Sequence, residues 1–377
     1  MPGTRRESAA SSVAFTVVVT VLVCLGALAI LAILAFAGAP RTVVLATALA
    51  AVPVGPLVAC YLWLDRYEPE PRSMLASGLL WGSFVATAAA IVLQGLGGLM
   101  GGVTDRLSLE LVAPLTEELC KGLFLFLLLW WRRGELDGVL DGIVYAGMVG
   151  IGFAFTENIL YLAAAYNGTD GMGPGGIEAV TTTFVVRCVV SPFAHPLFTA
   201  FTGIGVGLAV NARSRGARAL WPLAGLACAV VAHATWNTAT VYGADSFGIA
   251  YVVLMAPVFV GIASLAIWSR SSERRLLASA LTDAANRGLV PATDIGWVVD
   301  LGARRRSRAY ARSVGGKPGE RAMRDYQQAT IELGFLHYRY LRGTPPPDYA
   351  ARGQQFLQRI DELRPTIAFP GQVVPTR

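Results

Sequence analysis

The stretch TEELCKGLFLF, residues 116–126, sets three charged side chains in a segment that is otherwise apolar. The three are Glu117, Glu118 and Lys121, and the apolar run continues beyond them to Trp131. A charge near the centre of a lipid bilayer is costly, so a charged residue within a membrane span is expected to face protein and to serve a function. The stretch therefore predicts a membrane protein with a polar site inside it.

The composition of the whole chain agrees with this prediction. Of its 377 residues 54% are hydrophobic and 15% are charged, and the mean hydropathy is +0.53. These values exclude an ordinary soluble globular protein. A spanning helix needs about 20 predominantly apolar residues, and about eight runs qualify. We predict an all-α, polytopic membrane protein with spanning helices at residues 13–38, 42–64, 74–100, 108–131, 139–165, 178–210, 219–242 and 248–268.

Positive charge is distributed unevenly between the segments that connect these runs. If the N-terminus is cytoplasmic, nine arginines lie in inside segments (Arg5, Arg6, Arg66, Arg72, Arg132, Arg133, Arg213, Arg215 and Arg218), and only Arg41 and Arg106 lie outside. The positive-inside rule then predicts a multi-pass protein of the cell membrane with both termini in the cytoplasm. The expected organisation is a cytoplasmic N-terminus at 1–12, a transmembrane domain at 13–268 and a basic cytoplasmic tail at 269–377.

The tail holds 18 of the 31 lysines and arginines but only 10 of the 25 aspartates and glutamates. Helical stretches are expected near 273–287, 293–312, 319–342 and 348–363, separated at Gly288, at Gly315/Gly316 and at the prolines 345–347. We interpret the run RRRSR, Arg304 to Arg308, as a solvated face or a patch that contacts anionic lipid headgroups. Nucleic-acid binding is not expected.

Polar residues recur in the spans that follow the TEELCK stretch. Glu157 and Asn158 lie in GFAFTENILY, His195 lies between two prolines, and VAHATWN contains His233 and Asn237. At 1.5 Å per residue these groups lie roughly 20 to 27 Å from the cytoplasmic ends of their helices. The similar depths predict one shared polar site, and the prolines predict a broken helix beside it.

Several chemical interpretations of this cluster remain open. Glu117 and Lys121 are four residues apart and can form a structural ion pair, while Glu118 points about 100° away on the helix. A Glu and a His together can activate water or bind a metal, and a His/Asn pair can bind an oxyanion. The alternatives are a non-catalytic scaffold and a proton-coupled transporter that uses the same groups as a relay. Neither an HExxH motif nor a CxxC pair occurs in the chain.

Four strings, taken in order, resemble the motifs of one protein family. EELCK (117–121), FAFTEN (153–158), HPLFTAFTG (195–203) and HATWN (233–237) are similar to the EExxK, FxxxEN, His-plus-Gly and HxxWN motifs of the PrsW intramembrane proteases. That family is related to the CAAX prenyl proteases and bacteriocin-processing enzymes. The resemblance covers about 40–268 and leaves out the first span and the tail.

The resemblance implies a membrane-embedded peptidase whose substrate is a membrane protein, an anti-sigma factor in the best-known family role. It implies catalytic roles for residues of the four motifs. Glu117 or Glu118 would activate water with Glu157 and His195 as partners, and His233 and Asn237 would be ligands or the oxyanion hole. Lys121 and Asn158 belong to the same motifs.

The resemblance also implies either a metalloprotease or a hydrolase that uses a glutamate without a metal. We favour Glu118 as the general base, acting with His195, because no zinc spacing is recognised among the histidines. If zinc is bound instead, the expected ligands are His195, His233 and Glu157.

Overall fold

The fold is described from a computed structural model, in which residues 9–36, 39–99, 105–169, 174–343, 345–346 and 348–371 are described. Within these ranges the chain forms two compact units. Residues 9–65 and 70–267 make up the membrane unit, and residues 66–69 and 268–371 make up the tail unit. Most of the expected cytoplasmic segment 1–12 lies outside the described residues.

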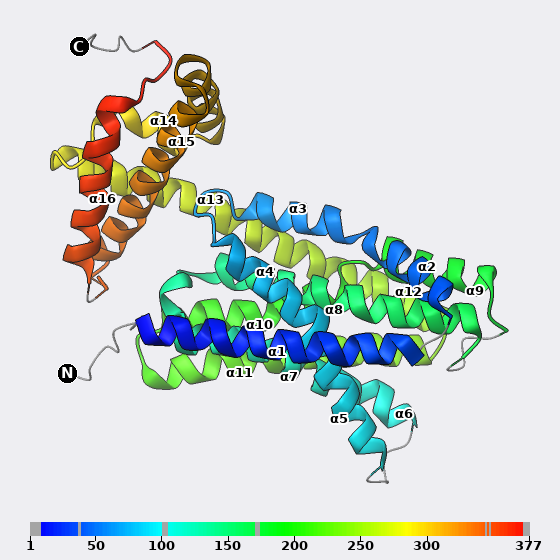
Figure 1. The fold of residues 1–377 in the computed structure, drawn as a ribbon. Helices are drawn as coiled ribbons and strands as arrows, with labels where there is room; N and C mark the ends of the chain where they lie inside the picture. The colour runs from blue at the N-terminus through cyan, green and yellow to red at the C-terminus, as the bar shows by residue number, and fades with distance from the viewer. Residues whose placement is uncertain are drawn as a thin grey trace. The chain divides into compact units, whose positions relative to one another are not determined.

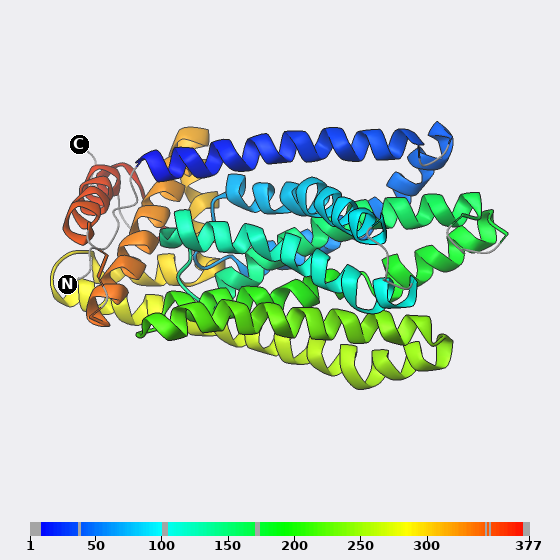
Figure 2. The same ribbon diagram turned by 90° about the horizontal axis from the view of Figure 1, so that it is seen from below.

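The membrane unit consists of helices, drawn from blue to yellow-green in Figure 1 and seen from below in Figure 2. Four short π-helical segments interrupt its α-helices: η1 (Trp81–Ala86), η2 (Ser108–Val112), η4 (Val185–Val190) and η5 (Tyr251–Met255). Every secondary-structure element in the described residues is a helix, so the predicted all-α class is confirmed. The α-helices are α1 (Ala9–Phe36), α2 (Pro40–Ala51), α3 (Val54–Leu64), α4 (Arg72–Leu80), α5 (Thr87–Leu99), α6 (Asp105–Leu107), α7 (Ala113–Trp131), α8 (Val139–Asn167), α9 (Ile177–Phe184), α10 (Ala194–Val210), α11 (Arg215–Val241), α12 (Ala244–Ala250) and α13 (Ala256–Asn286), the last of which continues into the tail unit.

Seven helical stretches of the described chain are long and apolar enough to cross a membrane: Ser12–Phe36, Pro40–Leu64, Arg72–Gly97, Val139–Asn167, Ile177–Val210, Arg215–Val241 and Ala244–Asn286. They correspond to seven of the eight predicted spans. The remaining predicted span, 108–131, falls on η2 and α7. It differs from the others because α7 carries three charged residues in only 19. The chain is a multi-pass membrane protein.

The expected helix break occurs immediately before His195. α9 continues directly into η4, which ends at Val190, and α10 begins at Ala194. Pro192 lies in the break and Pro196 in the first turn of α10, where neither can supply a backbone N–H. The break starts a new helix at the level of the polar site and sets His195 near its N-terminus.

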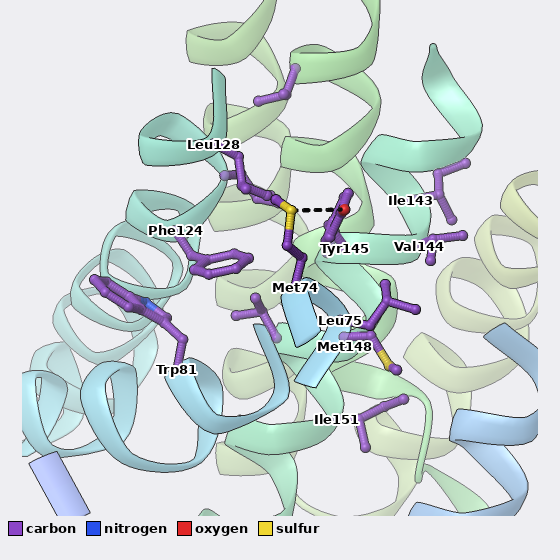
Figure 3. Close-up of a cluster of buried hydrophobic side chains, with 14 of the residues drawn as sticks. Met74, Leu75, Trp81, Phe124, Leu128, Ile143, Val144, Tyr145, Met148 and Ile151 are labelled. Carbon is purple, nitrogen blue, oxygen red and sulfur yellow. Dashed lines mark hydrogen bonds between the residues drawn. The ribbon is translucent and has the colours of Figure 1, made fainter. Parts of the chain in front are cut away.

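A buried hydrophobic cluster fixes how α7 is turned toward α8. Figure 3 shows Trp81 and Phe124 beside one another, and their ring centroids are 5.7 Å apart. Trp81 also donates its indole N–H to the carbonyl of Cys120 at 3.0 Å. On the other side, the Tyr145 hydroxyl donates to Glu70 Oε2 at 2.7 Å and contacts Met74 Sδ. Because Phe124 is anchored in this core, Lys121, one turn earlier, is directed inward.

Helices α8 and α10 approach each other through their backbones. A methyl group added to Gly142 would lie 2.0 Å from the carbonyl oxygen of Gly203, and one added to Gly150 would lie 2.6 Å from Pro196 Cα. Only glycine permits contacts this close. The two helices therefore hold Glu157 on α8 and His195 on α10 near each other.

The tail unit has its own hydrophobic core, formed by the end of α13 together with α14 (Ile295–Val299), α15 (Leu301–Leu341) and α16 (Tyr349–Leu363). Gly288 and Gly316 have positive φ, of 75° and 62°, and Gly316 interrupts α15 as the sequence predicts. The chain leaves α13 at Gly288 and bends within α15 at Gly316, where a left-handed conformation favours glycine.

The arginine run of the tail is only in part the solvated face that we expected. Arg305 and Arg306 are exposed. Arg304 is buried and donates to the carbonyl oxygens of Val298, Arg66 and Tyr67. Burial, together with nearby Arg308, lowers the pKa of Arg304 to about 10. The expectation was therefore wrong for Arg304, because its guanidinium satisfies backbone carbonyls inside the tail unit.

The close approach of α8 and α10 can be tested with Gly142→Ala. The added methyl group would overlap the Gly203 carbonyl, so we expect the free energy of unfolding in detergent to fall by about 1–3 kcal/mol. Gly55→Ala is the matched control, because nothing lies within 4 Å of its added methyl group. Equal thermal stability of the two variants would contradict the packing described here.

Candidate active site

A cavity of about 180 Å³ lies inside the membrane unit, between α5, η2, α7, α8, η4, α10 and α11. Its apolar wall includes Leu109 and Trp236. Its polar lining includes residues from six of these segments: Gln94, Glu117, Glu157, Arg187, His195, His233 and Asn237. The polar groups scattered over 144 positions of the sequence, from 94 to 237, thus meet at one cavity.

Lys121 lies at the centre of the cluster behind this cavity. Its side chain is completely buried, and its Nζ is 2.8 Å from Glu118 Oε1, 3.4 Å from Glu117 Oε2 and 3.0 Å from His195 Nδ1. The ammonium group also lies 3.7 Å from the centre of the Phe153 ring. It therefore supplies one positive charge that Glu117 and Glu118 share as their counter-charge.

The two glutamates of α7 occupy different positions. Glu118 is fully buried; its Oε1 accepts from His233 Nδ1 at 3.0 Å and its Oε2 accepts from the Thr199 hydroxyl at 3.2 Å. Glu117 lines the cavity, with Oε2 3.8 Å from His233 Nε2. Access to the cavity therefore belongs to Glu117 and not to Glu118, the residue that we expected to be the general base, and the general-base role itself stays a prediction. The rotation of α7 gives Glu117 access to the cavity and encloses Glu118.

Glu157 is held by a cation that comes from η4. Its Oε2 accepts from Arg187 Nη2 and, at 2.7 Å, from His195 Nε2. Arg187 Nε donates to Asn158 Oδ1 at 2.7 Å, and its guanidinium lies over the Tyr161 ring. Asn158 therefore positions Arg187 and does not line the cavity, and the catalytic role that the motif implied for it stays a prediction.

His233 and Asn237 project from one face of α11, as their spacing predicts. The His233 ring stacks on Phe198, with centroids 4.7 Å apart and planes at 15°. Asn237 Nδ2 donates to the backbone oxygen of Leu109 in η2 at 3.1 Å. This bond connects α11 to the η2 wall of the cavity and leaves the second N–H of the Asn237 amide for another acceptor.

All eight candidate residues from the sequence belong to this one cluster. Five of them line the cavity: Glu117, Glu157, His195, His233 and Asn237. The other three, Glu118, Lys121 and Asn158, lie behind the cavity and hold its lining residues. Sequence reasoning did not include Gln94 or Arg187 among the candidate site residues. Gln94 could have been found as the one polar side chain in the run AIVLQGLGG, residues 90–98.

The cluster also contains a candidate metal site. Ligand atoms of Glu117, His195 and His233 all lie within 4.8 Å of one another. One Glu and two His is a donor set of catalytic zinc sites, and the hydrogen bond from His233 Nδ1 to Glu118 is of the kind that orients a zinc-bound histidine. The residue types therefore fit zinc. Glu117 replaces Glu157 in the expected set, because Arg187 and His195 already engage Glu157 Oε2.

Comparison with known proteins agrees with the motifs and the cavity. Residues 70–262, half of the chain, match the family described as PrsW family intramembrane metalloprotease. The chain belongs to the PrsW family. All eight candidate residues lie within the matched range, whereas α1 and the tail unit lie outside it. The PrsW assignment identifies the chain as an intramembrane protease.

Two curated relatives support the PrsW assignment. The Protease PrsW of Geobacillus kaustophilus is 30% identical over 175 residues, which cover 46% of this chain and 70% of the relative. The Protease PrsW of Oceanobacillus iheyensis is 36% identical over 95 residues, 25% of this chain and 37% of the relative. No solved structure matches the chain.

The contribution of Arg187 can be measured with Arg187→Gln. This change leaves Glu157 without its cation, and we expect the free energy of unfolding to fall by about 2–4 kcal/mol. This value is near the lower end of the range for a broken buried ion pair, because the Arg187 side chain is one-quarter exposed. Arg213→Gln, at an exposed loop position, should leave stability unchanged. Thermal unfolding in detergent micelles compares the two variants. If the thermal stability of Arg187→Gln equals that of the unchanged protein, the ion pair between Arg187 and Glu157 does not stabilise the site.

Proposed function

We propose that this PrsW-family protein hydrolyses a peptide bond of another membrane protein in the cavity, with Glu117 as the general base. The observation that carries the proposal is the position of Glu117. It is the α7 carboxylate that lines the cavity, and its Oε2 lies near His233 Nε2. A water molecule bound between these two groups would have both a proton acceptor and an orienting partner.

The reaction follows from general acid–base chemistry. The oxygen of the bound water attacks the carbonyl carbon of the scissile peptide while one water proton moves to Glu117. Negative charge then develops on the carbonyl oxygen, for which the free N–H of the Asn237 amide is a donor at the cavity wall. Collapse of the tetrahedral intermediate breaks the C–N bond, and Glu117 gives the proton to the departing amine.

Two cations offset much of the negative charge of the site, Lys121 behind the cavity and Arg187 in its lining. Lys121 compensates Glu118 and part of the charge of Glu117, and Arg187 compensates Glu157. A preorganised arrangement of this kind stabilises developing charge without reorganisation during the reaction. Where a zinc ion is bound, Glu117, His195 and His233 would hold it, and the ion would supply Lewis-acid activation of water.

We further propose that the substrate is a single-span membrane protein such as an anti-sigma factor. This substrate class is supported by the family role and by the depth of the cavity, which we place in the outer half of the cell membrane when both termini are cytoplasmic. The exposed arginines of the tail unit, including Arg305 and Arg306, are proposed to contact anionic lipid headgroups. The alternative of a scaffold or a proton-coupled transporter would leave no cut products.

Glu117→Gln tests the proposed function directly. The amide cannot accept a proton from water, so we expect cleavage to fall at least about 100-fold, as for removal of a general base. N-terminal peptide mass spectrometry of membrane fractions should detect new N-termini in cells with the unaltered protein and lose them in the variant. Glu178→Gln is the matched control, because Glu178 is an exposed residue of α9. Undiminished products in Glu117→Gln cells would refute the general-base role.

Removal of metal distinguishes a metal-free reaction, with Glu117 as the general base, from a zinc-dependent one. With Glu117 as the base in the absence of a metal, purified protein treated with a strong chelator should retain cleavage, and elemental analysis should find less than one zinc per chain. Loss of cleavage on chelation, with recovery on adding zinc alone, would establish the zinc-dependent form.

A further inference from the structure

Gln94 brings an uncharged amide to the wall of the cavity. It lies on α5, is half-buried, and lines the cavity together with groups of α7, α8, η4, α10 and α11. The run AIVLQGLGG around it, residues 90–98, is otherwise apolar. A polar side chain in such a run is expected to face protein or a cavity, because contact with lipid is costly. Neither the four motifs nor the general-base reaction involves Gln94.

The orientation of the Gln94 amide is fixed by Thr116. Gln94 Nε2 donates to Thr116 Oγ1 at 3.3 Å. The Thr116 hydroxyl lies 2.8 Å from the carbonyl oxygen of Val112 and 3.0 Å from that of Ala113, and a carbonyl oxygen can only accept. The single hydroxyl proton is therefore directed to these carbonyls, which leaves Oγ1 as the acceptor for Gln94. Because Nε2 points to Thr116, Oε1 points away from it.

This orientation determines what Gln94 offers to the cavity. One N–H of the amide is used by Thr116. Within the part of the chain that the structure describes, Oε1 accepts no hydrogen bond and the second N–H donates none. A molecule in the cavity can therefore reach both a carbonyl acceptor and an N–H donor on the same side chain.

Asn237 offers the same two kinds of group from α11. Its Nδ2 donates to the carbonyl oxygen of Leu109 at 3.1 Å, so Oδ1 and the second N–H are left for a molecule in the cavity. Leu109 and Thr116 both lie in the short stretch that directly precedes Glu117 in the chain. The cavity thus has one oriented amide on α5 and another on α11, each fixed by this stretch.

An uncharged group that can both accept and donate matches the main chain of an unwound peptide. In a spanning helix the internal N–H and C=O groups pair with one another. Negative charge on the scissile carbonyl oxygen needs a donor from the enzyme, so the substrate segment has to leave its helical conformation at the site. Each N–H released in this way is costly away from water unless it finds a new acceptor.

We propose that Gln94 is a substrate-binding residue, whose Oε1 accepts a hydrogen bond from a main-chain N–H of the unwound substrate segment. The inference rests on the proposed function and adds a mode of recognition to it. At this contact a spanning segment is bound by its main chain and not by a particular side chain. The competing explanation is structural: the bond from Gln94 to Thr116 would only fasten α5 to α7.

A synthetic spanning peptide serves as the probe. It has about 20 leucine and alanine residues, lysines at both ends and two glycines at its centre, where unwinding is easiest. Ester analogues replace one main-chain N–H at a time by oxygen, at the two glycines and at the residues beside them. Each fluorescently labelled peptide is titrated with full-length protein in detergent micelles, and the anisotropy gives the dissociation constant. Every protein carries Glu117→Gln, so that the bound peptide stays intact.

The comparison of ester and amide peptides measures the contact itself. The ester that lacks the N–H opposite Gln94 should bind roughly three- to tenfold more weakly than the all-amide peptide, as for the loss of one hydrogen bond. In Gln94→Met this difference should disappear, because the thioether offers no carbonyl acceptor. Effects of the ester on the peptide alone cancel, since the same peptides are compared in every protein. Gln355→Met is the matched control and should keep the full difference, because Gln355 is an exposed residue of α16.

Gln94→Asn is the second variant, for use if Gln94→Met does not fold. It keeps a polar amide but shortens the side chain by one methylene group, so that the carbonyl no longer reaches the peptide. The difference between ester and amide peptides should therefore shrink in Gln94→Asn as well.

Three outcomes would overturn the inference: no binding of the all-amide peptide, no ester position with weakened binding, or the same ester-to-amide ratio in the Gln94 variant as in Gln355→Met. The last outcome would leave Gln94 a structural role only, because loss of a structural bond weakens the binding of all the peptides equally. Binding requires no cleavage. A refuted general-base role for Glu117 would therefore leave the Gln94 contact standing, and a refuted Gln94 contact would leave Glu117 as the base.

Discussion

The buried ammonium group of Lys121 is the contact on which the polar interior of this protein depends. It touches Glu117, Glu118 and His195, and through Glu118 it is connected to His233. Without that positive charge, two carboxylates would lie uncompensated in a region where water is scarce, a situation that costs several kcal/mol. The groups of α7, α10 and α11 can therefore assemble only around the lysine.

The rest of the fold keeps this cluster in place. The core around Trp81 and Phe124 sets the rotation of α7, and the glycine contacts between α8 and α10 bring Glu157 to His195. The π-helical segment η4 directs Arg187 to Glu157, and η2 forms a wall that Asn237 ties to α11. π-Helical turns are rare and often occur at functional sites, which agrees with their position around this cavity.

The site divides into residues that can meet a substrate and residues that hold them. Glu117, His195, His233 and Asn237 line the cavity, while Lys121, Glu118 and Asn158 are buried behind it. A motif such as EExxK therefore combines a group with access to the cavity and two groups without it. Membership of the PrsW family makes the chain an intramembrane protease, and this division indicates which part of each motif can perform the chemistry.

The sequence alone determined the spanning helices, the presence of one shared polar site and the helix break beside it. Apolar runs predicted the spanning helices, because the length of such a run is set by the thickness of the bilayer. Charges within those runs predicted one shared site, because isolated charges are costly in lipid. Prolines predicted the break before His195. Only the tertiary structure decided three points: which glutamate of α7 faces the cavity, that Arg187 forms an ion pair with Glu157, and that Arg304 is buried. The rotation of α7, the π-helical turn at Arg187 and the contact of Arg304 with residues 66 and 67 all depend on packing between segments distant in the chain, which local spacing does not encode.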